Sequence, residues 1–226
     1  MKPVIVFDLN ETLLDMSSLD PAFAKIFGPG AATTTRKKWF NQVLELFLAA
    51  TVIDEYRSFD KLTDDELQMI AAQQGGEASA DDRATLKKAL GEIPAYPDVQ
   101  PGLRRLKEAG FTVATLTNST AKSAQTLVDR AGLGDLFDRV LSVDAIERYK
   151  PAREAYEYAA NELKVKPGDI CLVAAHAWDI AGAVAAGCKG AFIARPEKVL
   201  SPGTAAPEFQ ARDVTALAEQ LVSRHG

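Results

Sequence analysis

A carboxylate follows directly after a short apolar run near the N-terminus. Residues 4–7 are Val-Ile-Val-Phe, Asp8 comes next, and a hydroxyl follows at Thr12. Four consecutive apolar residues that do not alternate with polar ones are typical of a strand buried on both faces of a parallel sheet. Ligands of such sheets bind beyond the carboxyl ends of the strands. Asp8 is therefore a candidate nucleophile, and the alternative is that it caps the following turn or helix.

Other predicted strands also end in polar residues. Residues 117–120, Thr-Asn-Ser-Thr, begin a predicted helix. Their hydroxyl and amide groups can cap that helix, and together with its N–H groups they can bind an anion. Lys150 precedes Pro151 after another strand, although a lone lysine is more commonly a solvated surface residue. If the sheet is parallel, these residues share one edge with Asp8.

A third polar cluster contains the chain's interior histidine. His176, Trp178 and Asp179 lie shortly after an apolar run at residues 170–173. An imidazole near its unperturbed pKa of ~6.5 is a natural general base. The alternative interpretation of His176 is a structural, hydrogen-bonded side chain.

These clusters need a parallel sheet to bring them together, and the C-terminal part of the chain has the corresponding pattern. Short apolar runs predict strands at residues 111–116, 139–142, 170–173 and 191–194. Helices that alternate with these strands are predicted at residues 102–109, 121–131, 152–163 and 177–186. Such alternation predicts a parallel sheet with helices on both faces.

Residues 19–93 break this alternation and have a helical pattern. An i, i+3, i+4, i+7, i+8 stripe is formed by Phe40, Val43, Leu44, Phe47 and Leu48. Further helices are predicted at residues 62–72 and 80–90. We therefore expect an α/β fold, with a Rossmann-like core formed by residues 1–15 and 94–226 and a helical cap inserted at residues 16–93.

Composition limits the partners of the chain. Its 226 residues carry a formal net charge of −5, and without a long basic run this argues against nucleic-acid binding. The basic cluster at residues 36–38 is typical of a solvated helix face. No apolar run approaches the ~20 residues that span a bilayer, and no apolar leader precedes the first strand. Cys171 and Cys188 lie in apolar stretches, as buried reduced thiols do. We expect a cytoplasmic protein without nucleic-acid or membrane partners.

The motifs, taken in order, resemble those of the haloacid dehalogenase superfamily. The resemblance rests on Asp8-x-x-x-Thr12, Thr117-Asn118, Lys150-Pro151 and Trp178-Asp179. More narrowly, the chain resembles the L-2-haloacid dehalogenase branch of this superfamily. This resemblance rests on Ser142-Val143-Asp144, Tyr149-Lys150-Pro151, Tyr156 and Ala177-Trp178-Asp179. The resemblance covers almost the whole chain, and it implies a homodimer.

Two positions favour this branch over the magnesium-dependent phosphatases of the superfamily. Those enzymes need a second aspartate, two positions after the nucleophile, as a general acid. Asn10 stands there and cannot donate and recover a proton. Ala175 replaces an acidic residue that would supply the hard oxygen ligand Mg²⁺ prefers. We therefore expect neither a metal nor a cofactor.

The resemblance implies a role for each site residue. Asp8 would attack the halogen-bearing carbon of a small 2-halocarboxylate to form an aspartyl ester, which water then hydrolyses. Lys150 and Thr12 would hold the Asp8 carboxylate, while Tyr156 and Asp179 would support Lys150 and the water. The residues implied to contact the substrate are Leu9, Asn10, Trp39, Phe40, Thr117, Asn118, Tyr156 and Trp178.

The chain departs from the branch at its cap helix. In members of the branch, an arginine that follows a tryptophan of the cap helix binds the halide and the carboxylate. In this chain Phe40 follows Trp39. Phe40 cannot bind an anion by charge, and its alternative role is in the cap core. Arg36 and Lys37, one helical turn earlier, lie on the same helix face and are candidate replacements.

The second departure lies in the fourth motif. Ala174 and His176 occupy positions where family members often carry serine and asparagine. His176 could replace the lost water-binding hydroxyl as a general base for ester hydrolysis. Two other functions stay open: a phosphatase with a depleted metal site, and a protein that keeps the fold but only binds a small anion or a protein partner.

Overall fold

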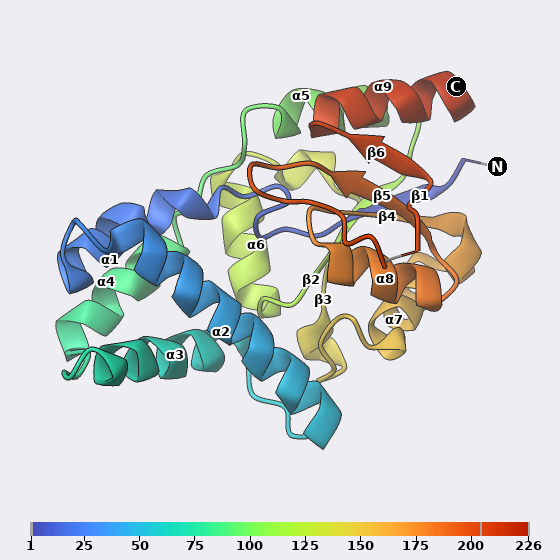
Figure 1. Ribbon diagram of the computed structural model, residues 1–226. Helices are drawn as coiled ribbons and strands as arrows, with labels where there is room; N and C mark the ends of the chain where they lie inside the picture. The colour runs from blue at the N-terminus through green and yellow to red at the C-terminus, as the bar shows by residue number, and fades with distance from the viewer. Residues whose placement is uncertain (1, 204, 226) are drawn as a thin grey trace. The chain divides into compact units, whose positions relative to one another are not determined.

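The computed structural model describes residues 2–203 and 205–225. Over these residues the chain forms two compact units (Figure 1). One unit combines the residues up to Asp15 with those from Ala95 onward, and the other contains residues 16–94. The first unit holds the sheet, and the second is helical.

Within the described residues, the first unit is built on a six-stranded sheet in the order β3-β2-β1-β4-β5-β6. All neighbouring strands in it are parallel. The strands are β1 (Val4–Phe7), β2 (Val113–Thr117), β3 (Arg139–Ser142), β4 (Ile170–Ala174), β5 (Lys189–Ile193) and β6 (Phe209–Ala211). The predicted α/β fold with a Rossmann-like parallel sheet is therefore confirmed.

The strand order places the end of β1 at the point where the connections reverse direction. From β1 the chain continues to β2 and β3 on one side, and β4 to β6 lie on the other. Phe7 pairs with Thr115 of β2 and with Val173 of β4. Ligands of open α/β sheets bind in the crevice beyond the strand ends at such a point. Asp8, the next residue, is held there by its N–H, which donates to the Val173 carbonyl at 2.9 Å.

Helices cover both faces of this sheet. They are α5 (Val99–Glu108), α6 (Ala121–Arg130), α7 (Arg153–Leu163), α8 (Ala177–Ala185) and α9 (Val214–His225). Helices α5 and α9 pack side by side on one face, and α7 and α8 on the other (Figure 1). Thr120 caps α6 by accepting a hydrogen bond from the Ser123 N–H, which confirms the predicted cap within residues 117–120.

The predicted elements differ from the observed ones mainly at their ends. The strand predicted at 111–116 begins only at Val113, because the Phe111 N–H still donates to the Leu106 carbonyl and closes the end of α5. Strand β5 lies at Lys189–Ile193, two residues before its predicted start. The short strand β6 and the helix α9 were not predicted.

The second unit contains the 3₁₀-helix η1 (Met16–Leu19) and the helices α1 (Asp20–Phe27), α2 (Ala32–Ile53), α3 (Phe59–Gln73) and α4 (Ala80–Leu90). Ser58 caps α3, and Ser79 and Asp82 form a capping box at the start of α4. Helix α4 has the bounds that the sequence predicted.

Aromatic packing organises the helical unit. The Trp39 indole is fully buried, donates to the Thr63 carbonyl at 3.0 Å, and contacts the rings of Phe23 and Phe40. The predicted apolar stripe on α2 is only partly correct. Its members Phe40, Val43 and Phe47 are buried, whereas Leu48 is 38% exposed.

The solvated face predicted for residues 36–38 is wrong at Arg36. This side chain is buried, and its Nε forms an ion pair with Asp20, which also accepts a hydrogen bond from Thr33. The guanidinium can be buried because a carboxylate neutralises it. Arg36 was a candidate replacement for the arginine that the branch has after its cap tryptophan. Its guanidinium is already paired with the Asp20 carboxylate.

No helix of the described chain has the length and apolar character needed to cross a membrane. The predicted thiols, Cys171 and Cys188, are free and buried. Burial raises the pKa of both to about 12, which makes them unreactive in the folded protein.

Gly182 permits a close contact that the site depends on. A Cβ added there would lie 2.5 Å from the Tyr156 hydroxyl and 2.5 Å from the Pro151 Cβ. We expect Gly182→Ala to lower the free energy of unfolding by about 1–3 kcal/mol, because it overpacks a close contact. Urea denaturation measures this loss. Gly203→Ala is the matched control, since a Cβ at Gly203 meets nothing within 4 Å. Equal stability of the two variants would contradict the proposed contact.

Candidate active site

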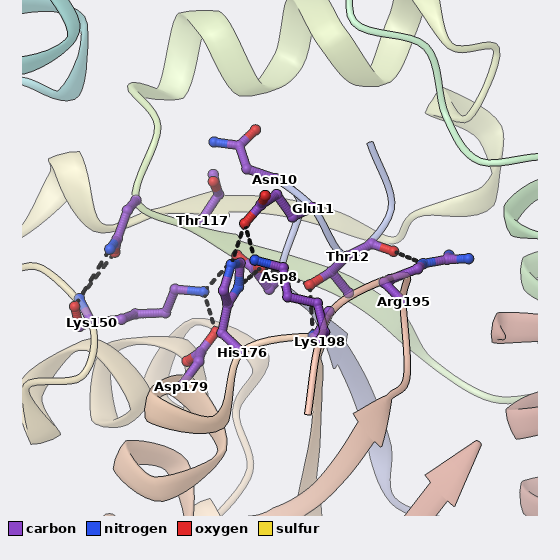
Figure 2. A network of polar contacts seen from close by, with 12 residues as sticks. Asp8, Asn10, Glu11, Thr12, Thr117, Lys150, His176, Asp179, Arg195 and Lys198 are labelled. Atoms are coloured by element: carbon purple, nitrogen blue, oxygen red, sulfur yellow. Dashed lines mark hydrogen bonds and ion pairs between the residues drawn. The ribbon is translucent and has the colours of Figure 1, made fainter. Parts of the chain in front are cut away.

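A tight turn after β1 positions the Asp8 carboxylate (Figure 2). The Leu9 carbonyl accepts the N–H groups of Thr12, Leu13 and Leu14 at 2.8–3.2 Å. This turn brings Thr12 back over Asp8. The Thr12 hydroxyl donates to Asp8 Oδ2 at 2.8 Å and accepts the Ala175 N–H at 2.9 Å. The turn therefore supplies one hydrogen bond to the Asp8 carboxylate. The other contacts of this carboxylate come from side chains that are distant in the sequence.

The Lys150 ammonium lies between two buried carboxylates. Its Nζ is 2.9 Å from Asp8 Oδ1 and 2.6 Å from Asp179 Oδ2 (Figure 2). The Tyr156 hydroxyl donates to the other Asp179 oxygen at 2.7 Å. Asp8 comes from the end of β1, Lys150 from the segment before α7, and Asp179 from the first turn of α8. The parallel sheet thus brings together three charges that are distant in sequence.

Asn118 holds the backbone at Lys150. Its Oδ1 accepts the Lys150 N–H at 3.0 Å, and its Nδ2 lies 3.4 Å from the Lys150 carbonyl. Asn118 follows β2, so this pair of contacts connects two strand ends. The observed contacts of the Asn118 amide therefore position the lysine, a role that the sequence did not indicate.

The charges in this cluster shift one another's pKa. Burial alone would raise the pKa of Asp8, but the cations of Lys150 and His176 outweigh it and hold that pKa well below its usual range. Burial lowers the pKa of Lys150, yet the two carboxylates raise it overall. The pKa of Asp179 is raised, because burial and the charge of Asp8 outweigh the attraction of Lys150. Asp8 is thus the ionised carboxylate, as a nucleophile requires.

His176 contacts the same carboxylate from the other side. Its Nδ1 lies 3.3 Å from Asp8 Oδ2, and its Nε2 lies 2.9 Å from Glu11 Oε2. Its ring packs against Trp178, with centroids 5.1 Å apart. Burial lowers the pKa of His176, but the carboxylates of Asp8 and Glu11 raise it above its usual value. The two carboxylates therefore favour the protonated form of the His176 ring.

Sequence reasoning missed three charged residues of this network (Figure 2). Glu11 contacts both His176 and the Lys198 ammonium. Arg195 donates from Nε to the Thr12 carbonyl at 2.9 Å and forms a bidentate ion pair with Asp98. Arg195 and Lys198 follow the strand predicted at 191–194, so the rule that located Lys150 could also have found them.

The other predicted contact residues lie in two places. Beside Asp8, the Asn10 amide donates to the Ser119 hydroxyl at 3.1 Å, and Thr117 Oγ1 accepts the Ser119 N–H at 3.1 Å. The Leu9 side chain is fully buried, and the Lys150 ammonium lies 5.9 Å from the Trp178 ring centroid. Trp39 and Phe40 belong to the helical unit, where they contact each other.

The described residues contain no group of three or more His, Cys, Asp and Glu side chains arranged to hold a metal ion. The cation that lies between Asp8 and Asp179 is the lysine ammonium. The arrangement supplies an ionised carboxylate with a fixed orientation, a neighbouring imidazole ring whose protonated form the carboxylates favour, and polar groups at the start of α6.

Comparisons with known proteins agree with this geometry. Residues 2–187 match the profile of a hydrolase family described as haloacid dehalogenase-like hydrolase. The (S)-2-haloacid dehalogenase of Pseudomonas sp. (strain YL) is 31% identical over 222 residues, which are 98% of this chain and 95% of that protein. The (S)-2-haloacid dehalogenase 1 of Pseudomonas sp. (strain CBS-3) is 32% identical over 217 residues, 96% of this chain and 95% of that protein.

Solved structures give the same result. The L-2-haloacid dehalogenase of Xanthobacter autotrophicus superimposes with a TM-score of 0.92 at 26% identity, covering 100% of both chains. A second structure of that enzyme, with chloropropionic acid covalently bound, has the same TM-score. The chain therefore belongs to the haloacid dehalogenase-like hydrolases. Within that family it lies in the L-2-haloacid dehalogenase branch, which confirms the resemblance of its motifs.

Loss of Lys150 would remove the cation that two buried carboxylates share. Lys150→Met leaves Asp8 and Asp179 as buried carboxylates without their shared cation. We expect the free energy of unfolding at pH 7 to fall by about 3–5 kcal/mol, as measured by urea denaturation. The double variant Lys150→Met/Asp179→Asn removes one of the unpaired charges and should recover part of the loss. A single variant as stable as the wild type would contradict this view of the network.

Proposed function

We propose that this protein releases halide from small 2-haloalkanoic acids through a covalent ester on Asp8, without a metal or other cofactor. The observation that carries the proposal is the Asp8 carboxylate itself. It is buried at the reversal point of the sheet, held in its ionised form by Lys150 and His176, and oriented by Thr12. The names of the relatives, which are 2-haloacid dehalogenases, supply the substrate class.

In the first step an Asp8 oxygen attacks the carbon that bears the halogen. The new C–O bond forms in line with the breaking carbon–halogen bond, and the halide leaves with the bonding electrons. Halide is a better leaving group than an alkoxide, so the step needs no general acid. Asn10, at the position where a phosphatase of the superfamily has its acid, is consistent with this chemistry.

In the second step water attacks the Asp8 carboxyl carbon and releases a 2-hydroxy acid. Lys150 faces one Asp8 oxygen, so it is placed to stabilise negative charge that develops there. Asp179 and Tyr156 keep the ammonium in place. We assign to His176 the role of base toward the water.

The substrate carboxylate needs donors of its own. We assign this role to Thr117, Asn118 and the exposed N–H groups at the start of α6, which suit an anion. Leu9, Asn10, Tyr156 and Trp178 would form the wall around the reacting carbon. Trp39 and Phe40 would contribute apolar contacts from the helical unit, which we propose acts as the cap.

Halide release from a panel of substrates tests the proposal. We expect release from chloro- and bromoacetate and from one enantiomer of 2-chloropropionate, and none with Asp8→Asn, because an amide is not a nucleophile. Circular dichroism and urea denaturation check that Asp8→Asn stays folded. Halide release by this variant would exclude Asp8 as the nucleophile. Strong Mg²⁺-dependent release of phosphate from an aryl phosphate, without halide release from any substrate, would instead favour a phosphatase.

We also propose that the protein is a homodimer located in the cytoplasm. Large apolar side chains near the end of α2 support the dimer: Val52 is 84% exposed and Ile53 is 61% exposed. A second copy of the chain would remove this apolar surface from water. The two free, buried cysteines support an intracellular location, where thiols stay reduced.

A charge on this surface should prevent association. We expect wild-type protein to sediment as a dimer and Val52→Glu to sediment as a monomer at micromolar concentration in analytical ultracentrifugation. Val199→Glu is the matched control, because Val199 is also 80% exposed but lies in the α/β unit. A wild-type monomer, or equal dissociation of both variants, would contradict the proposed interface.

A further inference from the structure

Glu11 and Lys198 extend the charge network beyond the residues of the proposed reaction. Lys198 contacts Glu11 Oε2, which lies 2.9 Å from His176 Nε2. On the other side of His176, its Nδ1 lies 3.3 Å from Asp8 Oδ2 (Figure 2). Cations and anions thus alternate from Lys198 through Glu11 and His176 to Asp8. Glu11 is the group that holds the far side of the imidazole ring.

The backbone conformation at Glu11 would favour a glycine, so the turn itself does not require a side chain at this position. Its φ is 59°, in the left-handed region where a side chain is unfavourable and glycine is preferred. Backbone conformations of this kind persist where the surroundings enforce them, and they are enriched at functional sites. The contacts with His176 and Lys198 are the surroundings that fix the Glu11 side chain.

Glu11 also determines which nitrogen of His176 faces the nucleophile. With Nε2–H donating to Glu11, Nδ1 points toward Asp8. Nδ1 is buried, and it makes no hydrogen bond of good geometry with any described residue. A neutral ring in this orientation presents a lone pair on Nδ1 at the carboxyl group of Asp8. This is the position from which a base would reach a water that attacks the carboxyl carbon.

We propose that Glu11, supported by Lys198, positions His176 as the base for hydrolysis of the Asp8 ester, and that formation of the ester converts His176 from a cation into that base. The inference rests on the proposed function, because it needs an ester on Asp8. Glu11 and Lys198 act through His176 and are positioning residues.

The protons balance over one turnover. When Asp8 becomes an ester and halide leaves, imidazolium His176 loses the negative charge of Asp8 and releases its proton to solvent. Neutral His176 then takes a proton from the attacking water and gives it to the departing alkoxide as the Asp8 carbon–oxygen bond breaks. The carboxylic acid left on Asp8 returns its proton to His176. One proton is released per halide, as the overall hydrolysis requires.

The charges around His176 give the direction of this switch. Its ring faces Asp8 and Glu11 and packs on Trp178, with Lys198 behind Glu11 and the Lys150–Asp179 pair behind Asp8. Both facing carboxylates raise the pKa of His176 against the effect of burial. Esterification removes one of them, so the pKa falls and the base becomes available. Hydrolysis of the ester should therefore be faster as the pH rises through the lowered pKa.

Rapid-quench single turnover with 2-bromopropionate separates the two steps. Bromide release reports ester formation, and the mass of the intact enzyme reports the adduct. We expect Glu11→Gln to release bromide at close to the wild-type rate but to hydrolyse the ester roughly 10²-fold more slowly, so that the adduct accumulates. Glu11→Gly should show the same two rates as Glu11→Gln. Because glycine suits the left-handed backbone, this second variant separates the loss of the carboxylate from a folding defect of Glu11→Gln. Glu208→Gln, which removes a carboxylate paired with Arg224, is the control and should leave both steps unchanged.

A pH indicator in stopped flow tests the switch itself. In wild-type enzyme one proton should appear with the bromide burst, before the ester is hydrolysed. Proton release only with hydrolysis, or equal slowing of both steps in Glu11→Gln, would overturn the inference and leave the ester mechanism intact. A wild-type enzyme with neither bromide release nor adduct would instead contradict the proposed function.

Discussion

The site depends on one buried cation, the Lys150 ammonium shared by Asp8 and Asp179. A charge can be buried only if it is paired and hydrogen-bonded. Lys150 is completely buried and meets this condition with two carboxylates, one of which is held further by Tyr156. The fold contributes the rest of the arrangement. Parallel strands end at a common edge, and the residues that follow β1, β3 and β4 therefore meet.

The same constraint gives Asp8 its reactivity. The carboxylate is buried, which alone would favour its neutral form, and the neighbouring cations keep it ionised. Thr12 fixes its rotation through one oxygen, and Lys150 binds the other. A buried anion with few solvent contacts and a fixed orientation is a suitable nucleophile for an in-line displacement, since little water has to leave it before it reacts.

Much of this arrangement could be predicted from the sequence. The apolar run before Asp8 and the strand–helix alternation after residue 110 predicted a parallel sheet, and the parallel sheet predicted that Asp8, Lys150 and Asp179 share an edge. The helical character of residues 19–93 was also correct. These predictions succeeded because each depends on local periodicity or on the common direction of parallel strands.

The remaining features depend on side-chain contacts that periodicity does not encode. The partner of Glu11, His176, is 165 residues away, and local periodicity around residue 11 does not indicate this contact. The burial of Arg36 depends on Asp20, which lies in another helix. Strand β6 has three residues and no extended apolar run. Leu48 is exposed because packing on α2 occupies a narrower face than the apolar stripe predicts.

In the proposed mechanism the Asp8 carboxylate forms the ester, and water attacks its carboxyl carbon. Hydrolysis of a 2-haloacid in ¹⁸O-water under single-turnover conditions tests this directly, with mass spectrometry of the peptide that contains Asp8. We expect one ¹⁸O atom in the Asp8 side chain and an unlabelled 2-hydroxy acid from the first turnover. Label in the product and none on Asp8 would mean that water attacks the substrate itself, and Asp8 would not be the nucleophile.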